Sequence, residues 1–367
     1  MSAEGRLALL AAGGTGGHMF PAEALASELK RRGWRIALVT DARGERYAAD
    51  FPCDEKHFTD AATFAGRGPL GKLAAGAAIL RGVFGAMGLV GRLKPAVAVG
   101  FGGYPSFPAM AAARLKGVPT CVHEQNAILG RVNRALAPHV TRIASAFRTV
   151  GRVPEGAKHK VTFVGNPVRS AVAAAAAPFR APEAGAPLNL LIFGGSQGAR
   201  LFAETAPAAV AALPEEIRRR LNVVHQARDE DAGAARAAYA AAGVDAELAP
   251  FFKDLPARIA AAHLVVSRAG ASTVTELGVL ARPAVLTPLG IAMDDHQTEN
   301  AKILTNAGAA ELLPESAFTA EGLAAILARL LGDPAGLAQM SAKADGVAPG
   351  DAAARLADMV EEIAKVT

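Results

Sequence analysis

Residues 6–18 read RLALLAAGGTGGH, and residues 188–200 read LNLLIFGGSQGAR. Each stretch is a short apolar run without polar alternation, followed at once by a glycine-rich turn. Such a run is typical of a strand whose two faces are both covered, as in a parallel sheet between layers of helices. The pattern therefore predicts a β-strand, a turn and a helix at the start of each half of the chain.

Similar apolar runs recur along both halves, and each is followed by an alanine-rich stretch with helical periodicity. The predicted strands are residues 6–12, 35–40, 96–101, 119–123 and 141–144 in the first half, and residues 188–193, 221–225, 263–267 and 283–287 in the second. This alternation predicts an α/β protein with two doubly wound parallel sheets.

The chain length of 367 residues is enough for two domains with separate cores. Glycine and proline are frequent in residues 165–187, which predicts a linker with a cleft beside it. We expect an N-terminal domain over residues 1–165 and a second domain over residues 166–345. A last helix within residues 346–367 can return to the first domain.

The composition, 51% hydrophobic and 20% charged, is that of an ordinary globular protein. A net charge of +5 does not indicate nucleic acid, but it suits an acidic ligand or an anionic membrane surface. Cys53 and Cys121 have neither a disulfide pattern nor metal-ligand spacing, which favours a reducing cytoplasm. The apolar stretch after Arg6 is too short for a signal peptide or a membrane span.

Three glycine turns each follow a predicted strand and open a predicted helix: residues 13–18, 194–200 and 267–273. Free amides at a helix N-terminus bind phosphate. In the third turn, SRAGAST, Ser272 and Thr273 can face a diphosphate while Glu276 accepts from two ribose hydroxyls. Each turn alone also fits a plain turn or helix cap. Together they predict a nucleotide-sugar ligand.

The glycine turns also match other motifs. A dinucleotide fingerprint would need glycine where Met19 stands, so a nicotinamide enzyme is disfavoured. Residues 194–198 match the G-x-S-x-G of a hydrolase, with Ser196 as nucleophile. The remaining triad members would be Asp254 with His263, or Asp294 with His296. A sensor that binds a sugar nucleotide without turnover is a third possibility.

Two further matches are weaker. Residues 66–72 spell G-x-x-x-x-G-K, but Leu73 replaces the Ser or Thr that a phosphate-binding loop requires. Asp229 and Asp231 spell D-x-D in a polar run before an alanine-rich stretch, which predicts a solvated helix start. We therefore expect no catalytic metal and no cofactor.

Six motifs in this order closely resemble the MurG family: GGTGGH at 13–18, GFGGY at 100–104, HEQN at 123–126, GNPVR at 165–169, GGSQGAR at 194–200 and HQTENA at 296–301. That family transfers N-acetylglucosamine (GlcNAc) from UDP-GlcNAc to the muramyl 4-hydroxyl of lipid I, which forms lipid II in peptidoglycan synthesis. The resemblance implies the GT-B architecture, in which two Rossmann-like domains face a cleft. It also implies an inverting reaction and a peripheral location on the cytoplasmic face of the inner membrane.

The resemblance also implies roles for individual residues, with the acceptor mostly on the first domain and the donor mostly on the second. Thr15, Gly16 and Gly17 would line the N-terminal side of the cleft. Donor contacts would come from Asn126, Arg169, Ser196 and Gln297, ribose contacts from Glu276, and a backbone contact to uracil from Phe252. The chain departs from a common family form at Pro105 and Phe107.

His18 is the leading candidate for the catalytic base, because it ends the first glycine turn at a helix N-terminus. The helix dipole there disfavours the protonated ring, which helps the imidazole to accept a proton. Glu124 is the second candidate, since it is an acid directly after a predicted strand. Alternatively, His18 only forms a hydrogen bond to its loop or to a donor phosphate.

Residues 70–94 have the pattern of a helix that lies on a membrane surface. The apolar residues at helical spacing are Leu73, Leu80, Phe84 and Met87, and the basic residues around them are Arg67, Lys72, Arg81, Arg92 and Lys94. This combination suits anionic lipid. A core helix of the first domain is the alternative.

Overall fold

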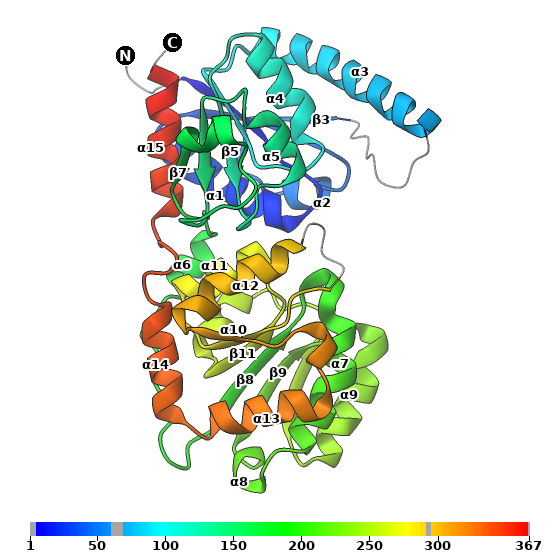
Figure 1. Cartoon of the computed structure of the whole chain (residues 1–367), viewed down its shortest axis with the longest axis vertical. Coiled ribbons are helices and arrows are strands. Elements are labelled where there is room, and N and C mark those ends of the chain that lie inside the picture. The colour runs from blue at the N-terminus through cyan, green and yellow to red at the C-terminus, as the bar shows by residue number, and fades with distance from the viewer. Residues whose placement is uncertain (1–4, 60–68, 291–294, 366–367) are drawn as a thin grey trace. The chain divides into compact units, whose positions relative to one another are not determined.

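The computed structural model describes residues 5–59, 69–290 and 295–365, and it divides the chain into two compact units (Figure 1). The first unit is formed by Met1–Arg169 with Pro349–Thr367, and the second by Ser170–Ala348. Each unit is built on one parallel sheet, so the two are described in turn.

The first unit contains a seven-stranded sheet in the order β3-β2-β1-β4-β5-β6-β7. Its strands are β1 (Leu7–Ala11), β2 (Arg35–Thr40), β3 (Glu55–Phe58), β4 (Val97–Gly100), β5 (Thr120–Glu124), β6 (Arg142–Ser145) and β7 (Val161–Phe163). The strand order reverses between β1 and β4. The loops after these two strands therefore leave toward opposite faces, and ligands of such sheets bind at this point.

Helices cover both faces of this sheet: α1 (Gly16–Arg31), α2 (Glu45–Ala48), α3 (Pro69–Leu93), α4 (Ser106–Leu115), α5 (Arg131–Leu136) and α15 (Ala352–Lys365), with a 3-10 turn, η1 (Glu155–Lys160). Side chains of β1 alternate between the two cores. Leu10 packs with α1 and α15, and Leu9 packs with α3, α4 and α5. The long apolar run at residues 6–12 is thus explained by burial on both faces.

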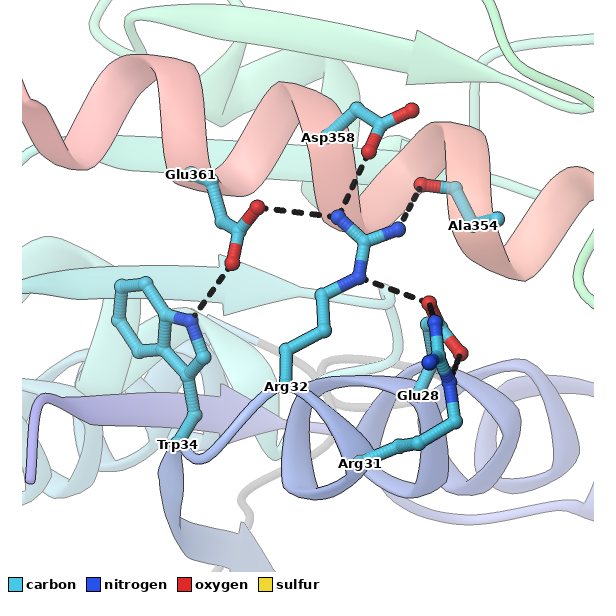
Figure 2. A network of polar contacts seen from close by, with 7 residues as sticks. All are labelled: Glu28, Arg31, Arg32, Trp34, Ala354, Asp358 and Glu361. Carbon is cyan, nitrogen blue, oxygen red and sulfur yellow. Dashed lines mark hydrogen bonds and ion pairs between the residues drawn. The ribbon is translucent and has the colours of Figure 1, made fainter. Parts of the chain in front are cut away.

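The C-terminal helix α15 packs against α1, so the chain ends within the first unit (Figure 1). Figure 2 shows the polar network that accompanies this packing. The Arg32 guanidinium pairs with Glu28 of α1 and with Asp358 and Glu361 of α15, at 2.6 to 3.0 Å. Trp34 Nε1 donates to the other oxygen of Glu361 at 3.0 Å. Arg32 therefore joins the two ends of the sequence.

The helix α3 is partly a core helix and partly exposed. Ala86 and Val90 are buried against the core, and Met87 packs beside them. Leu80 and Phe84 are 61% and 71% exposed. The prediction that Met87 shares one surface with these two residues is therefore wrong, because the second half of α3 is turned toward α4. Arg67 and the side chains of Lys72 and Leu73 lie outside the described part of the chain.

The second unit contains a six-stranded parallel sheet in the order β10-β9-β8-β11-β12-β13, with a reversal between β8 and β11. Its strands are β8 (Leu188–Phe193), β9 (Leu221–Gln226), β10 (Asp245–Ala249), β11 (Leu264–Ser267), β12 (Ala284–Leu286) and β13 (Ala310–Leu312). The longer helices are α7 (Gly195–Ala211), α9 (Asp229–Ala241), α11 (Ala271–Val279), α12 (His296–Ala307), α13 (Ala320–Leu331) and α14 (Pro334–Ala344). The shorter ones are α6 (Ser170–Ala174), α8 (Glu215–Arg218), α10 (Leu255–Ala261) and the 3-10 turn η3 (Glu315–Ala317).

The predicted fold class is confirmed, since two Rossmann-like parallel sheets are present and all nine predicted strands are found. Four strands were missed, β3, β7, β10 and β13, and every one of them is an edge strand. An edge strand is half-exposed and lacks the continuous apolar run of a central one. The D-x-D match begins α9, where Arg228 pairs with Glu230 and Asp231, which confirms the predicted helix start.

The Arg32 network predicts a stability difference between two neighbouring arginines. We expect Arg32→Ala to lower the free energy of unfolding by about 2 kcal/mol, because Asp358 and Glu361 lose a charged donor. Arg31→Ala is the matched control, since its side chain is 71% exposed and pairs with Glu28, and we expect a change within about 0.5 kcal/mol. Urea unfolding of the full chain measures both. Equal losses would show that the network contributes no more than a surface ion pair.

Candidate active site

In the first unit, the loops after β1 and β4 pack tightly together at the strand reversal. A Cβ atom on Gly13 would lie 2.9 Å from Pro105 Cγ, so a larger residue at position 13 would force the loops apart. Gly102 and Gly103 have φ angles of 84° and 75°, which glycine adopts without strain. Pro105, which departs from the common family form, thus fills the space over the first glycine turn.

His18 lies in the first turn of α1, and its ring packs against the loop after β4. Its Nδ1 atom is 3.3 Å from Thr15 Oγ1, and a Cβ atom on Gly102 would lie 3.4 Å from its ring. The ring is half-exposed. Thr15 and the loop after β4 therefore orient the imidazole without enclosing it, as a group that exchanges a proton with a ligand requires.

The first glycine turn is held by an acid that the sequence analysis missed. Asp41, at the carboxyl end of β2, accepts the backbone N–H groups of Gly14 at 3.1 Å and Gly44 at 3.0 Å. Arg43 donates to its other oxygen at 2.8 Å. The available signal was an acidic residue directly after a buried strand, at the edge where ligands bind.

Glu124 is enclosed by donors. One oxygen accepts from the backbone and side-chain N–H groups of Asn126, both at 3.0 Å. The other accepts from Gly130 N at 2.8 Å and from Asn133 Nδ2 at 2.9 Å. Burial raises the pKa of Glu124, and these hydrogen bonds oppose that effect. Glu124 is only 2% exposed, so its geometry suits the organisation of the loop after β5 rather than proton exchange with a substrate.

Asn133 was also missed, and it connects Glu124 to the loop after β4, beside His18. Its Nδ2 atom donates to Glu124 and to the carbonyl of His123. The same atom and the His18 ring would each lie 3.4 Å from a Cβ on Gly102. The two candidates for the base are therefore linked through Asn133 and Gly102.

The HEQN and GNPVR motifs meet through a buried histidine. His123 Nε2 is 3.0 Å from the carbonyl of Gly165, and Gln125 Nε2 donates to His123 Nδ1 at 3.1 Å. Burial lowers the pKa of His123 to about 4, so the ring is neutral and its Nε2–H donates to Gly165. A Cβ on Gly165 would lie 2.4 Å from Pro349 Cγ. These contacts join the chain segments that leave and re-enter the first unit.

Arg169, the last residue of GNPVR, lies at the start of α1. Its guanidinium stacks on the Phe20 ring at 4.2 Å, an arrangement favourable for a cation. The Phe20 ring in turn covers Gly16, where a Cβ atom would be only 2.8 Å away. Arg169 therefore belongs to the same corner as Thr15, Gly16 and Gly17.

The strand reversal of the second unit carries the other two glycine turns. Gly194 precedes α7, and the side chains of residues 195–199, including Ser196, lie outside the described part of the structure. Ser272 and Thr273 are in the first turn of α11, and Glu276 is buried in the same helix. Within the described residues, Ser272 Oγ has no hydrogen-bond partner. Four of the predicted donor residues thus come from the two helices at this reversal.

Phe252 lies in the loop after β10, and Gln297 lies in the first turn of α12, on the other side of that reversal. Phe252 is buried, with the Arg258 guanidinium 4.3 Å from its ring centre. Gln297 begins α12, and its Oε1 atom accepts from Leu289 N at 2.9 Å. The side-chain N–H₂ group of Gln297 is thereby oriented away from Leu289.

The hydrolase interpretation is not supported by its first triad. His263 stands at the amino end of β11, where its Nδ1 accepts from Asn189 N at 2.9 Å. Ser196 follows the carboxyl end of the neighbouring strand β8, which is about 20 Å away for a six-residue strand. Asp254 with His263 therefore cannot activate Ser196. Asp294 of the second possible pair lies outside the described residues.

No group of three or more His, Cys, Asp or Glu side chains is arranged to hold a metal ion within residues 5–59, 69–290 and 295–365. Cys121 is buried, and burial raises the pKa of its thiol to about 12, which suits a core residue. Helix N-termini, hydroxyls and Glu276 are therefore the groups that these loops offer to a ligand.

Comparison with known proteins gives matches over nearly the whole chain. The glycosyltransferase family 28 N-terminal domain matches residues 8–145, and the glycosyltransferase family 28 C-terminal domain matches residues 189–363. A relative from Chelativorans sp. (strain BNC1) is 52% identical over 98% of this chain and 96% of its own length. One from Phenylobacterium zucineum (strain HLK1) is 50% identical over 98% and 99%.

Both relatives are named UDP-N-acetylglucosamine--N-acetylmuramyl-(pentapeptide) pyrophosphoryl-undecaprenol N-acetylglucosamine transferase. Among solved structures, MurG of Acinetobacter baumannii is 31% identical and superimposes with a TM-score of 0.79, covering 97% of this chain and 99% of that one. The likeness therefore includes both units.

The hydrogen bonds of Glu124 predict that removing its carboxylate destabilises the fold, which removal of an exposed catalytic base would not do. We expect Glu124→Ala to lower the free energy of unfolding by about 3 kcal/mol, because buried donors of Asn126, Gly130 and Asn133 lose their acceptor. Thermal and urea unfolding measure this, with the exposed Glu155→Ala as the control. If Glu124→Ala abolished turnover but unfolded like the wild type, Glu124 would return as a candidate base.

Proposed function

This chain belongs to the MurG family within glycosyltransferase family 28, and on that premise we propose that it transfers GlcNAc from UDP-GlcNAc to lipid I. The product is lipid II, a precursor of peptidoglycan. The observation that carries the proposal is the 52% identity to a named transferase over almost the full chain. It is supported by glycine turns at the strand reversals of both sheets, where phosphate-bearing ligands bind.

The donor binds the second unit in this proposal. The N-termini of α7 and α11, with Ser196, Ser272 and Thr273, hold the diphosphate. Glu276 accepts from the ribose hydroxyls, and the backbone at Phe252 contacts uracil. Gln297, Asn126 and Arg169 complete the donor contacts.

The acceptor binds the first unit, beside Thr15, Gly16 and Gly17. The muramyl 4-hydroxyl attacks the anomeric carbon of the donor, a new C–O bond forms, and the bond from that carbon to the diphosphate breaks. His18 removes the hydroxyl proton, and UDP leaves with the electron pair of the broken bond. Attack opposite the leaving group inverts the anomeric centre. The two helix N-termini stabilise the negative charge that develops on UDP.

His18 is proposed as the base, rather than Glu124, because of their surroundings. His18 is partly exposed, and its Nδ1 atom is 3.3 Å from Thr15 Oγ1. Both oxygens of Glu124 are occupied by two hydrogen bonds each. Glu124 is accordingly proposed to position the loop after β5.

The exposed face of α3 is proposed to dock on the membrane that holds the acceptor. Leu80 and Phe84 are one helical turn apart and therefore share a face. Phe58, 54% exposed, lines a groove of about 500 Å³ together with Arg81 and Arg92. Apolar side chains flanked by arginines suit an anionic lipid surface.

A peripheral protein on the cytoplasmic face of the inner membrane would use such a surface to reach its acceptor. None of the helices that the structure describes is long and apolar enough to cross a membrane. The docking proposal rests on the exposed side chains Phe58, Leu80 and Phe84.

The proposed function and its base are tested together. With UDP-GlcNAc and a lipid I analogue, the wild type should form lipid II and UDP. His18→Ala should lower kcat by roughly two to four orders of magnitude, with UDP-GlcNAc affinity nearly unchanged in calorimetry. The exposed His139→Ala should behave as the wild type. Retained kcat with lost donor affinity would make His18 a binding residue, and a wild type that binds without turnover would support a sensor.

Membrane docking is tested by introducing negative charges on the apolar face. Leu80→Glu combined with Phe84→Glu should reduce binding to anionic liposomes by about 10-fold or more, since both side chains would have to leave the lipid. Turnover of a soluble acceptor analogue should remain, because the changes lie outside the proposed site. Leu115→Glu is the control, an equally exposed leucine at the end of α4. Unchanged liposome binding in a folded double variant would refute the docking proposal.

A further inference from the structure

Residues 287–290, which follow β12, are held in place by side chains that come from three other parts of the second unit. Arg268 Nη1 donates to the carbonyls of Thr287 at 3.3 Å and Pro288 at 3.2 Å. Leu289 N donates to Gln297 Oε1 at 2.9 Å, and Gly290 N donates to Glu315 Oε2 at 2.7 Å. Each residue of the loop 287–290 is thus held through a backbone polar group.

Glu315 connects these contacts. It belongs to η3, after β13, and the oxygen that accepts from Gly290 N also pairs with Arg268 Nη1 at 3.2 Å. Arg268 is 7% exposed and stacks over the Phe202 ring at 5.3 Å. Removing one partner of a buried ion pair is destabilising. Removing Glu315 would therefore release Gly290 and leave Arg268 with its backbone acceptors at Thr287 and Pro288.

The loop in turn determines how Gln297 is oriented. Leu289 N is a donor, so the atom of Gln297 that faces it must be the carbonyl oxygen. The N–H₂ group is left on the other side, and it can offer only donors to a ligand. If Leu289 moved with the loop, the amide would lose the contact that distinguishes its two orientations.

The loop is also tied to the glycine turn after β11. Asn300, which is buried in α12, donates from Nδ2 to the carbonyl of Ala269 at 3.2 Å. Arg268 precedes Ala269 in that turn. Hydrogen bonds therefore connect three segments: the turn with Ser272 and Thr273, the loop 287–290 and the start of α12. Glu315 of η3 adds a contact to this group through Gly290 and Arg268.

We propose that Glu315 is a positioning residue for donor binding, which acts through the loop 287–290 to orient the Gln297 amide. Glu315 lies outside every motif that carries the family resemblance. The inference rests on the proposed function in that UDP-GlcNAc is the ligand. The hydrogen-bond acceptor at position 315, rather than the charge alone, is what the loop requires, since Gly290 N is a neutral donor.

Calorimetric titration of UDP-GlcNAc and of UDP tests this inference on the full chain. Gln297→Ala should lower UDP-GlcNAc affinity by about 10-fold, the effect of one lost hydrogen bond. Glu315→Ala should lower UDP-GlcNAc affinity by the same factor as Gln297→Ala. The ratio of UDP-GlcNAc affinity to UDP affinity should also be the same in the two variants. The double variant should lose no more affinity than either single variant, because both substitutions remove the same contact between Gln297 and the ligand.

The conservative variant separates this role from a general loss of stability. Glu315→Gln keeps a carbonyl oxygen for Gly290 N, and it should retain UDP-GlcNAc affinity within about threefold. Glu311→Ala is the matched control. Glu311 belongs to β13, it pairs with Arg329 of α13, and it has no contact with residues 287–290 in the described structure. This variant should bind like the wild type.

Three outcomes would overturn the inference: full affinity in Glu315→Ala, additive losses of about 100-fold in the double variant, or an equal loss in Glu315→Gln and Glu315→Ala. In each case the wild type still binds UDP-GlcNAc, so the proposed function would stand. A wild type that binds no UDP-GlcNAc would overturn the proposed function, and this inference with it.

Discussion

A parallel strand that is buried on both faces can lead to its neighbour only through a crossover on one face of the sheet. This constraint places all carboxyl ends of the strands at one edge, and the reversal of strand order decides where two adjacent loops diverge. In this chain the reversal occurs between β1 and β4 and again between β8 and β11. The glycine turns, His18 and the proposed diphosphate contacts all depend on it.

Glycine at the first reversal serves the packing of loops as much as the approach of a ligand. Gly13 makes room for Pro105, Gly16 for Phe20, and Gly102 for His18 and Asn133. The catalytic candidate is therefore oriented by backbone that approaches closely from another strand. The His18 side chain is therefore already restricted in its rotamers in the folded protein, so it loses less conformational freedom when substrate binds.

Carboxylates hold these loops by a common chemistry. Asp41 accepts Gly14 N, Glu124 accepts Gly130 N, and Glu315 accepts Gly290 N. Each occupies a backbone donor that would be costly to leave unpaired, while the donors at the helix N-termini stay available for a phosphate. An acidic residue near a ligand loop can thus support that loop, and its hydrogen-bond partners distinguish this role from that of a reactive group.

The sequence by itself determined the central strands, the glycine turns and the family, because burial on both faces leaves an unbroken apolar run and close backbone approach requires glycine. Local patterns did not reveal the edge strands β3, β7, β10 and β13, which lack a continuous buried apolar run, or the packing of Met87 against the core. The roles of Glu124, Asp41 and Glu315 were decided by tertiary structure alone. Gly14 and Asp41 are 27 residues apart, and Gly290 and Glu315 are 25 apart, so only the folded chain brings each acceptor to its donor.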